Sequence, residues 1–210
     1  MAIKIHGKST STCTRRVATI CNELGLKYEV VPIDLMKGAH KQPEYLENMQ
    51  PFGVIPVVQD EDGTKIYESR AIARYLTAKY GKDTGLLPSS SDPVAYGLFE
   101  QAASIEYSSF DPYASGLTME RVFKKMFGGE ANEVLAAHYE TNLRSKLEGY
   151  ERVLAKQKYL AGDHITLADL FHLPYGSYIN QVDPDFFGSK PQVKRWWDDI
   201  SSRESWKSLQ

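Results

Sequence analysis

The sequence predicts a two-domain fold, with an α/β domain at the N-terminus and an all-α domain after it. Three observations support this prediction. Short apolar or alternating runs, which indicate strands, occur only within residues 1–81. Residues 81–93 are rich in Gly, Ser and Pro, as expected for a connection between domains. Beyond them, apolar residues recur at spacings of three or four, which is typical of packed helices.

The composition is that of an ordinary globular protein. Of the 210 residues, 42% are hydrophobic and 25% are charged, and the formal net charge is -2. This balance gives no electrostatic reason to expect nucleic acid or an anionic membrane as a partner. No apolar run approaches the roughly 18 residues that cross a bilayer, and the N-terminus lacks a signal-peptide core. We therefore expect a cytoplasmic protein whose two cysteines, Cys13 and Cys21, remain reduced.

The first three elements follow from periodicity and from a proline. Residues 2–6 alternate as a half-buried strand does. Residues 12–24 carry apolar side chains at helical spacing, and Gly25 supplies a C-terminal stop. Residues 27–35 form the second strand. Because Pro32 within it cannot donate a hydrogen bond to a ladder, this strand is expected at the edge of the sheet.

The rest of the first domain completes an α/β unit. The stretch GAHKQPEYLENM predicts a loop with a short helical turn, and VIPVVQDEDGTKIYESR predicts two strands joined at Asp62 and Gly63. A helix follows, with Ser69 as its N-cap and Gly81 at its end. The resulting order β-α-β-α-β-β-α over residues 1–81 resembles the thioredoxin fold.

The second domain is predicted to be helical throughout. We place the first domain at residues 1–81, a linker at residues 82–92 and the helical domain at residues 93–210. A capping box formed by Thr166 and Asp169 starts one of its helices. The clearest helix is predicted from a single apolar stripe, which consists of Leu135, Tyr139, Leu143, Leu147, Tyr150 and Leu154.

Four stretches resemble soluble glutathione transferases, and among them the serine-type phi class known from plants and fungi. They are STCTRRV, KGAHKQPEYLENMQPFGVIPV, YESRAIARYL and HITLADLFHLPY, and they keep the family's order and spacing. The resemblance covers most of the chain. It implies the glutathione transferase fold, in which a thioredoxin-like domain binds glutathione and a helical domain contributes the electrophile pocket. It also implies a cytoplasmic homodimer with glutathione as co-substrate and no metal.

The polar row from Ser9 to Thr14 is where the resemblance locates the chemistry. A free thiol has a pKa of about 8.5, so lowering the glutathione pKa by about two units requires roughly 2.7 kcal/mol of stabilisation. A hydroxyl donor at a helix N-terminus supplies such stabilisation. Matched to the phi pattern, Ser11 donates to the sulfur and Thr12 lies beside it, while Ser9 and Thr10 remain alternatives. Without the resemblance, a helix cap would be the simpler use of Ser11 or Thr12.

The stretch PFGVIPVV resembles the family's cis-proline segment. The resemblance implies a cis peptide bond before Pro56, although only about 5% of X-Pro bonds in folded proteins are cis. It also implies that the main chains of Val54 and Ile55 pair with the cysteinyl part of glutathione, as an added strand would.

Two polar pairs are implied to bind the ends of glutathione. Glu68 and Ser69 precede a helix and correspond to the pair that holds the γ-glutamyl ammonium and carboxylate, and helix N-termini suit carboxylates. His40 and Lys41 correspond to the basic pair that binds the glycyl carboxylate. Without the resemblance, Ser69 would be a simple N-cap and the basic pair would be solvated.

Cys13 is the most reactive-looking side chain near Ser11, but helical geometry turns it away. Two residues along a helix correspond to roughly 200° of rotation, so Cys13 should face away from a sulfur bound at Ser11. We expect Cys13 and Cys21 to be small buried packing residues. Arg15 is four residues after Ser11 and could approach the site, but a solvated pair with a nearby carboxylate is the expected role of both Arg15 and Arg16.

By resemblance, the electrophile pocket is lined by the first loop and by the helical domain. The candidates are Leu35, Met119, Phe123 and Tyr178, with Phe110 and Tyr113 as alternatives. Aromatic residues and methionines at helical spacing belong more often to a core than to a pocket. Phe52 and the helix ESRAIARYL are expected to contribute to dimerisation.

Three functions are compatible with these residues. The leading interpretation is a glutathione transferase that conjugates small hydrophobic electrophiles, with reduction of organic hydroperoxides as a side activity. A non-catalytic ligand carrier or regulatory protein on the same fold is the second. The third is a cysteine-dependent thiol transferase or dehydroascorbate reductase that uses Cys13. The complete set of glutathione-binding residues favours the first, because a carrier does not need such a site.

Overall fold

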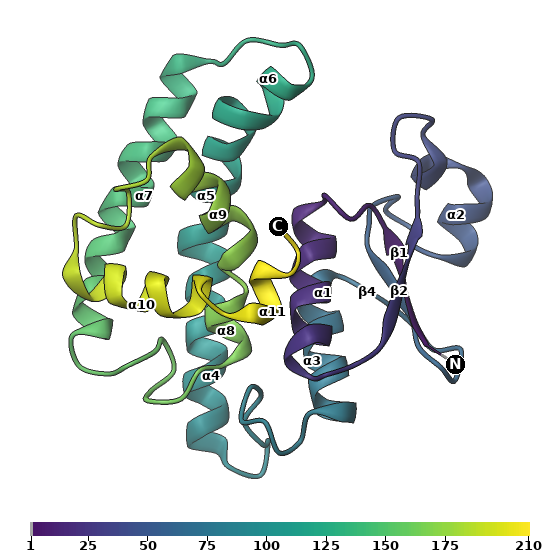
Figure 1. The fold of residues 1–210 in the computed structure, drawn as a ribbon, viewed down its shortest axis with the longest axis horizontal. Coiled ribbons are helices and arrows are strands. Elements are labelled where there is room, and N and C mark those ends of the chain that lie inside the picture. The colour runs from purple at the N-terminus through teal and green to yellow at the C-terminus, as the bar shows by residue number, and fades with distance from the viewer. Residues whose placement is uncertain (1) are drawn as a thin grey trace. The chain divides into compact units, whose positions relative to one another are not determined.

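The computed structural model describes residues 2–210. The chain forms two compact units, which Figure 1 shows as a sheet-containing part and an all-helical part. The first unit contains the chain up to Thr84 together with Glu204–Gln210, and the second is Gly85–Arg203. Within the described residues, no helix has both the length and the apolar character needed to cross a bilayer.

The first unit is built on a four-stranded sheet in the order β2-β1-β3-β4. Strand β1 (Ile3–Gly7) runs parallel to β2 (Tyr28–Pro32) and antiparallel to β3 (Val57–Gln59), which pairs antiparallel with β4 (Lys65–Tyr67). The predicted thioredoxin-like order is therefore confirmed. Strand β2 lies at an edge and Pro32 is its last residue, as the missing N–H group of proline requires.

Helices α1 (Thr12–Glu23) and α3 (Ser69–Tyr80) pack on each other and share one core with the sheet. On the other side of the sheet lie the one-turn helix η1 (Ala39–Lys41) and the short helix α2 (Pro43–Asn48) (Figure 1). The core draws on β1, α1, β3 and α3 and consists of Ile3, Ile5, Val17, Ala18, Cys21, Val58, Ile72 and Leu76.

The C-terminal residues differ from the predicted division of the chain. Helix α11 (Glu204–Lys207), which we predicted within the helical domain, belongs to the first unit and contacts α1. The Asn22 side chain donates to the Ser205 carbonyl over 2.9 Å, and Trp206 is buried beneath the Arg15 guanidinium. A four-residue helix carries too little periodicity to show which core its tryptophan enters.

The second unit begins with a helical run whose individual helices were not predicted from the sequence. Two stretches of wider, π-type turns interrupt it, and Pro112 follows the first of them. Proline has no N–H group for the usual bond to the preceding turn, so the helix widens just before it. The run consists of α4 (Pro93–Ile105), η2 (Glu106–Phe110), α5 (Asp111–Thr118), η3 (Met119–Phe123) and α6 (Lys124–Met126).

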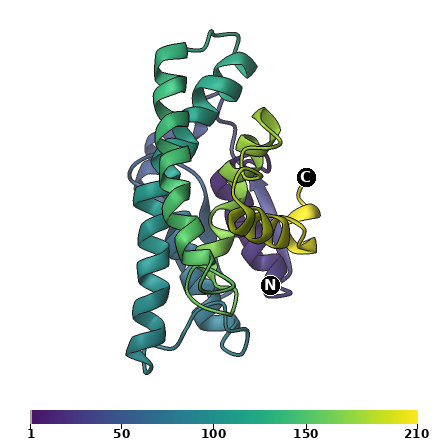
Figure 2. The same ribbon diagram turned by 90° about the vertical axis from the view of Figure 1, so that its left-hand side faces the viewer.

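The long helix α7 (Glu133–Leu154) lies beside α5, and the two run along the long axis of this unit in Figure 2. The predicted apolar stripe is buried at Leu143, Leu147 and Leu154, whereas Leu135 at its beginning is 41% exposed. The remaining helices of the unit are α8 (Leu167–Leu170), α9 (Leu173–Val182) and α10 (Pro191–Ser201).

The predicted capping box is present at the start of α8. The Asp169 carboxylate accepts the Thr166 N–H over 2.9 Å, and it also accepts the Leu160 N–H and the indole N–H of Trp196. Asp169 is fully buried, and burial raises the pKa of its carboxyl. This polar centre ties three elements of the helical unit together, which agrees with its interpretation as a folding feature.

Candidate active site

The pairing of the strands brings the predicted site segments to one end of the sheet. His6, near the end of β1, pairs with Val57 at the start of β3, and Val57 in turn pairs with Tyr67 at the end of β4. Gly7 pairs with Pro32, the last residue of β2. The loop to Ser11, the Ile55-Pro56 segment, the Glu68-Ser69 pair and the loop to His40 therefore all leave or enter the sheet at the same end.

Ser11 occupies the N-cap position of α1 without using its hydroxyl as a cap. Its backbone is extended (φ -72°, ψ 135°), and its carbonyl accepts the Arg15 N–H over 2.8 Å. The side chain is half-buried and makes no capping hydrogen bond, whereas Ser9 and Thr10 are exposed in the preceding turn. Thr12 is buried as the first helical residue. Among the hydroxyls of this row, Ser11 is therefore the one that stands at the helix terminus without a capping role.

Gly7 lets the first turns of α1 approach the proline segment closely. A Cβ atom on Gly7 would lie 2.5 Å from Thr14 Oγ1 and 3.5 Å from Pro56 Cβ. A larger residue at Gly7 would require the Thr14 side chain or its surroundings to shift, because real Cβ atoms do not approach neighbours that closely. The peptide bond between Ile55 and Pro56 is cis, which confirms the prediction made from the resemblance.

Only some of the main-chain hydrogen-bonding groups before Pro56 are available to a ligand. The Val54 carbonyl accepts the Tyr45 hydroxyl over 2.8 Å, and burial raises the pKa of Tyr45 to about 12, so this hydroxyl stays a donor. Within the described residues, neither the N–H nor the carbonyl of Ile55 has a backbone hydrogen-bond partner. Of the two predicted main-chain contacts, Ile55 therefore offers both of its groups and Val54 offers its N–H.

His40 and Lys41 lie in η1, directly against the segment that leads to the proline. Lys41 Nζ donates to the Phe52 carbonyl over 3.2 Å. Gly53 has a φ of +61°, and a Cβ atom there would lie 2.8 Å from the His40 carbonyl oxygen. The Nδ1 atom of His40 is buried without a hydrogen-bond partner in the described structure. The two basic residues are thus held beside the proline segment, although twelve or more positions separate them from Gly53 and Val54 in the chain.

Helix α3 begins one residue earlier than predicted, so Ser69 is not its N-cap. Glu68 is the N-cap of α3, at a φ of +68°, and Ser69 is the first helical residue. A left-handed conformation at a residue other than glycine costs about 1–3 kcal/mol and is concentrated at functional sites. Ser69 is 5% exposed, and its Oγ accepts a hydrogen bond of 2.9 Å from Arg16 Nη1. The carboxylate of Glu68 is exposed at the same helix terminus.

The prediction of solvated arginines is wrong for Arg16, which is 1% exposed. Its position was readable from the sequence, because it lies four residues after Thr12 and four before Ile20, both on the buried face of α1. Cys13 is half-buried, and its sulfur accepts a 3.6 Å hydrogen bond from Arg16 Nη1. Cys21 is a packing residue as predicted, and burial raises the pKa of its thiol to about 12.

The candidate electrophile residues lie in both units. Leu35 is half-buried in the turn after β2 of the first unit. In the second unit, Met119 is 47% exposed on η3, and the Phe123 ring meets the Tyr178 ring edge-on, with 5.1 Å between centroids. Phe110, named as an alternative, is 1% exposed and packs on His172 with 4.6 Å between ring centroids. It is therefore a core residue.

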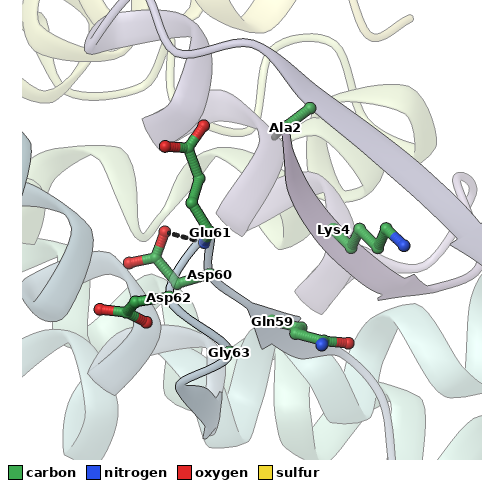
Figure 3. A pocket seen from close by; sticks show the side chains of 7 residues that line it. All are labelled: Ala2, Lys4, Gln59, Asp60, Glu61, Asp62 and Gly63. Carbon is green, nitrogen blue, oxygen red and sulfur yellow. Dashed lines mark hydrogen bonds between the residues drawn. The ribbon is translucent and has the colours of Figure 1, made fainter.

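A hollow of about 290 Å³ lies at the opposite end of the sheet, around the β3–β4 turn (Figure 3). Its acidic side chains support the fold. Asp60 accepts hydrogen bonds from Tyr75, Tyr80 and Lys79, which outweigh the effect of burial and lower its pKa to about 2. In the part of the chain that the structure describes, no group of three or more His, Cys, Asp or Glu side chains converges as a metal site. The hollow is lined by Ala2, Lys4, Gln59, Asp60, Glu61, Asp62 and Gly63.

Comparison with known proteins identifies the family. Residues 5–84 match the model "Glutathione S-transferase, N-terminal domain", and residues 110–204 match "Glutathione S-transferase, C-terminal domain". The Arabidopsis thaliana protein glutathione S-transferase PM239X14 is 63% identical over 197 residues, which cover 94% of this chain and 90% of that protein. Glutathione S-transferase F9 of the same plant is 40% identical, covering 99% of this chain and 95% of its own.

Solved structures agree with these sequence relatives. Glutathione transferase F2 from Populus trichocarpa is 36% identical and superposes with a TM-score of 0.92, covering 99% of this chain and 96% of its own. Glutathione S-transferase I from maize, solved with an atrazine glutathione conjugate, is 30% identical with a TM-score of 0.92, covering 100% and 96%. The sheet topology, the helical unit and these matches over nearly the whole length lead to one conclusion: the chain belongs to the glutathione transferase family and is of the phi-class type.

Proposed function

We propose that the protein is a glutathione transferase that conjugates glutathione to small hydrophobic electrophiles, with Ser11 as the catalytic residue. One observation carries the assignment of Ser11. Its hydroxyl stands at the N-terminus of α1, at the end of the sheet where the cis-proline segment also enters, and is not used to cap the helix. The maize relative was solved with a glutathione conjugate of atrazine, an apolar aromatic compound, which supports this class of electrophile.

Catalysis consists mainly of forming and holding a thiolate. The Ser11 hydroxyl donates to the glutathione sulfur and remains a hydroxyl, while the first N–H groups of α1 favour negative charge at the same place. Together they lower the thiol pKa toward neutral pH. The thiol gives its proton to solvent, and the thiolate attacks the electrophilic carbon. The new C–S bond replaces the bond to the leaving group, which departs with its electron pair. Binding both molecules side by side supplies the rest of the acceleration.

The peptide is held by main-chain and charged groups of the first unit. Ile55 pairs with the cysteinyl backbone, with a further contact from the Val54 N–H, and Pro56 fixes this segment. Ser69 and the N-terminus of α3 receive the γ-glutamyl carboxylate, and the Glu68 carboxylate receives its ammonium.

The other end of glutathione and the electrophile have their own residues. His40 and Lys41 bind the glycyl carboxylate, and Thr12 lies beside the sulfur. For the electrophile we propose four apolar residues. Phe123 and Tyr178 offer the faces of two rings packed edge-on, and a half-exposed Met119 adapts to ligands of different shape. Leu35 from the loop after β2 completes the set.

We further propose that the enzyme works as a cytoplasmic homodimer, takes part in detoxification and reduces organic hydroperoxides as a side reaction. Phe52 supports the dimer, because its side chain is 73% exposed and an apolar ring of that size is costly to leave in water. Two cysteines that are both free support a reducing compartment.

The experiment that tests the function is a conjugation assay with a generic aromatic halide. The purified protein should catalyse formation of the thioether with saturation in both glutathione and halide, whereas a ligand carrier would bind the halide without turnover. A Cys13→Ser variant separates the cysteine-dependent alternative. Because serine keeps an acceptor for Arg16, this variant should retain at least about half of the conjugating activity; loss of nearly all activity would favour thiol chemistry at Cys13.

A further inference from the structure

Arg16 and Ser69 form a buried hydrogen bond between two helices of the first unit. Arg16 lies on α1 and is 1% exposed, and Ser69 opens α3 and is 5% exposed. Arg16 Nη1 donates to Ser69 Oγ over 2.9 Å, and these residues are 53 positions apart in the sequence. Burying a guanidinium is costly, so its hydrogen bonds must offset the loss of water.

This hydrogen bond fixes the direction in which Ser69 can donate. A serine hydroxyl has one hydrogen to donate and two lone pairs that accept. Because Arg16 points into one lone pair, the hydroxyl hydrogen must point away from the guanidinium. The N-cap of α3 is Glu68, and among the described residues the Ser69 hydroxyl donates no hydrogen bond. The hydrogen is therefore left for a ligand at the N-terminus of α3.

We propose that Arg16 is a positioning residue that holds Ser69 so that its hydroxyl donates to the γ-glutamyl carboxylate of glutathione. This inference rests on the proposed function, which assigns that carboxylate to Ser69. A charged donor polarises the hydroxyl that accepts from it, so the bond from the hydroxyl to the carboxylate becomes stronger. The positive charge of Arg16 and the N-terminus of α3 favour the same anion.

Steady-state kinetics of an Arg16→Gln variant test the proposal. At saturating electrophile, the variant should raise KM for glutathione about tenfold or more, which corresponds to losing a hydrogen bond that involves a charge. Its kcat should change less than about threefold, because Arg16 does not act on the sulfur. Arg16→Lys, which keeps the positive charge, should show a smaller rise in KM. If Arg16→Gln does not fold, Arg16→Lys carries the test, and an unchanged KM in that variant overturns the proposal.

The neighbouring arginine supplies a matched control. Arg15 lies on the same helix and is half-buried, with its guanidinium over the Trp206 ring at 5.9 Å. Arg15→Gln removes the same group and should leave KM for glutathione within about twofold of the wild-type value. An equal rise in KM for both variants would mean that a general loss of α1 stability, and not the contact with Ser69, is responsible.

Ser69→Ala distinguishes the inference from the proposed function. Since Arg16 acts through Ser69, adding Arg16→Gln to Ser69→Ala should raise KM less than about twofold further. If Arg16→Gln raises KM equally in both backgrounds, or lowers kcat at unchanged KM, the positioning role is wrong and the assignment of the carboxylate to Ser69 stands. If Ser69→Ala alone leaves KM unchanged, that assignment fails, and the role of Arg16 fails with it.

Discussion

In Ser11 the backbone and the side chain have separate roles. Its backbone starts α1, and its carbonyl accepts the first helical hydrogen bond, while its hydroxyl makes no capping bond. A serine hydroxyl at an N-cap usually accepts from the helix, and giving up that bond costs about 1 kcal/mol. The proposed function uses this hydroxyl as the donor to the glutathione sulfur.

Replacing Ser11 by alanine should make thiolate formation depend on higher pH. Without the hydroxyl, we expect the pKa seen in the pH dependence of kcat/KM to rise by about one to two units, since each unit corresponds to about 1.4 kcal/mol. Activity should be lost below that pKa and approach the wild-type value above it. The measurement is kcat/KM between about pH 5.5 and 9.5, with glutathione and an aromatic halide.

Ser9→Ala is the control for this prediction. Because Ser9 is exposed in the preceding turn, its replacement should leave the pH dependence of kcat/KM unchanged. If Ser11→Ala keeps the wild-type profile and Ser9→Ala shifts it, the catalytic hydroxyl has been assigned to the wrong position in the row.

At the scale of elements, the close packing of α1 against the end of β1 is the contact on which the geometry of the candidate site depends. The helix approaches the sheet so closely that a side chain at Gly7 would collide with Thr14 Oγ1 at 2.5 Å. Thr14 is itself 1% exposed, so any shift of its side chain takes place in a buried environment. The first turns of α1 and the cis-proline segment thus come close together around Gly7 and Thr14.

Gly7→Ala should therefore both destabilise the protein and impair the site. Overpacking of this kind costs about 1–3 kcal/mol, and we expect a drop of that size in the free energy of unfolding measured with urea. A Gly7→Ala/Thr14→Ala double variant removes the colliding hydroxyl and should recover most of the loss. Failure of the double variant to recover stability would mean that the backbone conformation at Gly7, and not the contact with Thr14, is responsible.

At the scale of the whole molecule, the formal net charge is only -2, and stability depends on pH through groups whose pKa differs between the folded and unfolded states. Asp60 has the clearest effect, since its side chain is fully buried and pairs with Lys79 over 2.7 Å. Its folded pKa of about 2 lies below the ordinary value of 3.8. A lowered pKa stabilises the folded state above the unfolded pKa, and this contribution is lost as the pH falls toward the folded value.

We expect Asp60→Asn to lower stability at neutral pH and to flatten the pH dependence between about pH 4 and pH 2. Thermal unfolding measured from pH 7 down to pH 2 checks both effects. Asp83→Asn is the control, because Asp83 is exposed in the turn after α3 and should leave the curve unchanged. If the stability of Asp60→Asn falls with decreasing pH as steeply as that of the wild type, another carboxylate governs the acid transition.

Most of the elements in the first unit could be predicted because their signals are local. The alternation of β1, the proline in β2 and the turn at Gly63 each act within a few residues, and the structure agrees with all of them. The individual helices from Pro93 to Met126 could not be predicted. Pro112 follows the first π-type stretch, but no local pattern marks the second, Met119–Phe123.

The candidate site was predictable to the level of segments. The row around Ser11, the proline segment and the Glu68-Ser69 pair were named from the sequence, and strand pairing explains why they meet at one end of the sheet. The N-cap of α3 was predicted wrongly. Serine is the better capping residue, so the sequence favours Ser69, but the left-handed backbone of Glu68 makes Glu68 the N-cap.

The sequence by itself determined the fold class, the family and the set of candidate glutathione residues, since periodicity and short motifs act locally and survive without knowledge of contacts. Only the tertiary structure decided that the Ser11 hydroxyl makes no capping bond and that the Ser69 hydroxyl accepts from Arg16. The bond from Arg16 to Ser69 joins residues 53 positions apart, and no local pattern encodes such a contact. The C-terminal helix follows the same rule, because its place was set by the core that could bury Trp206.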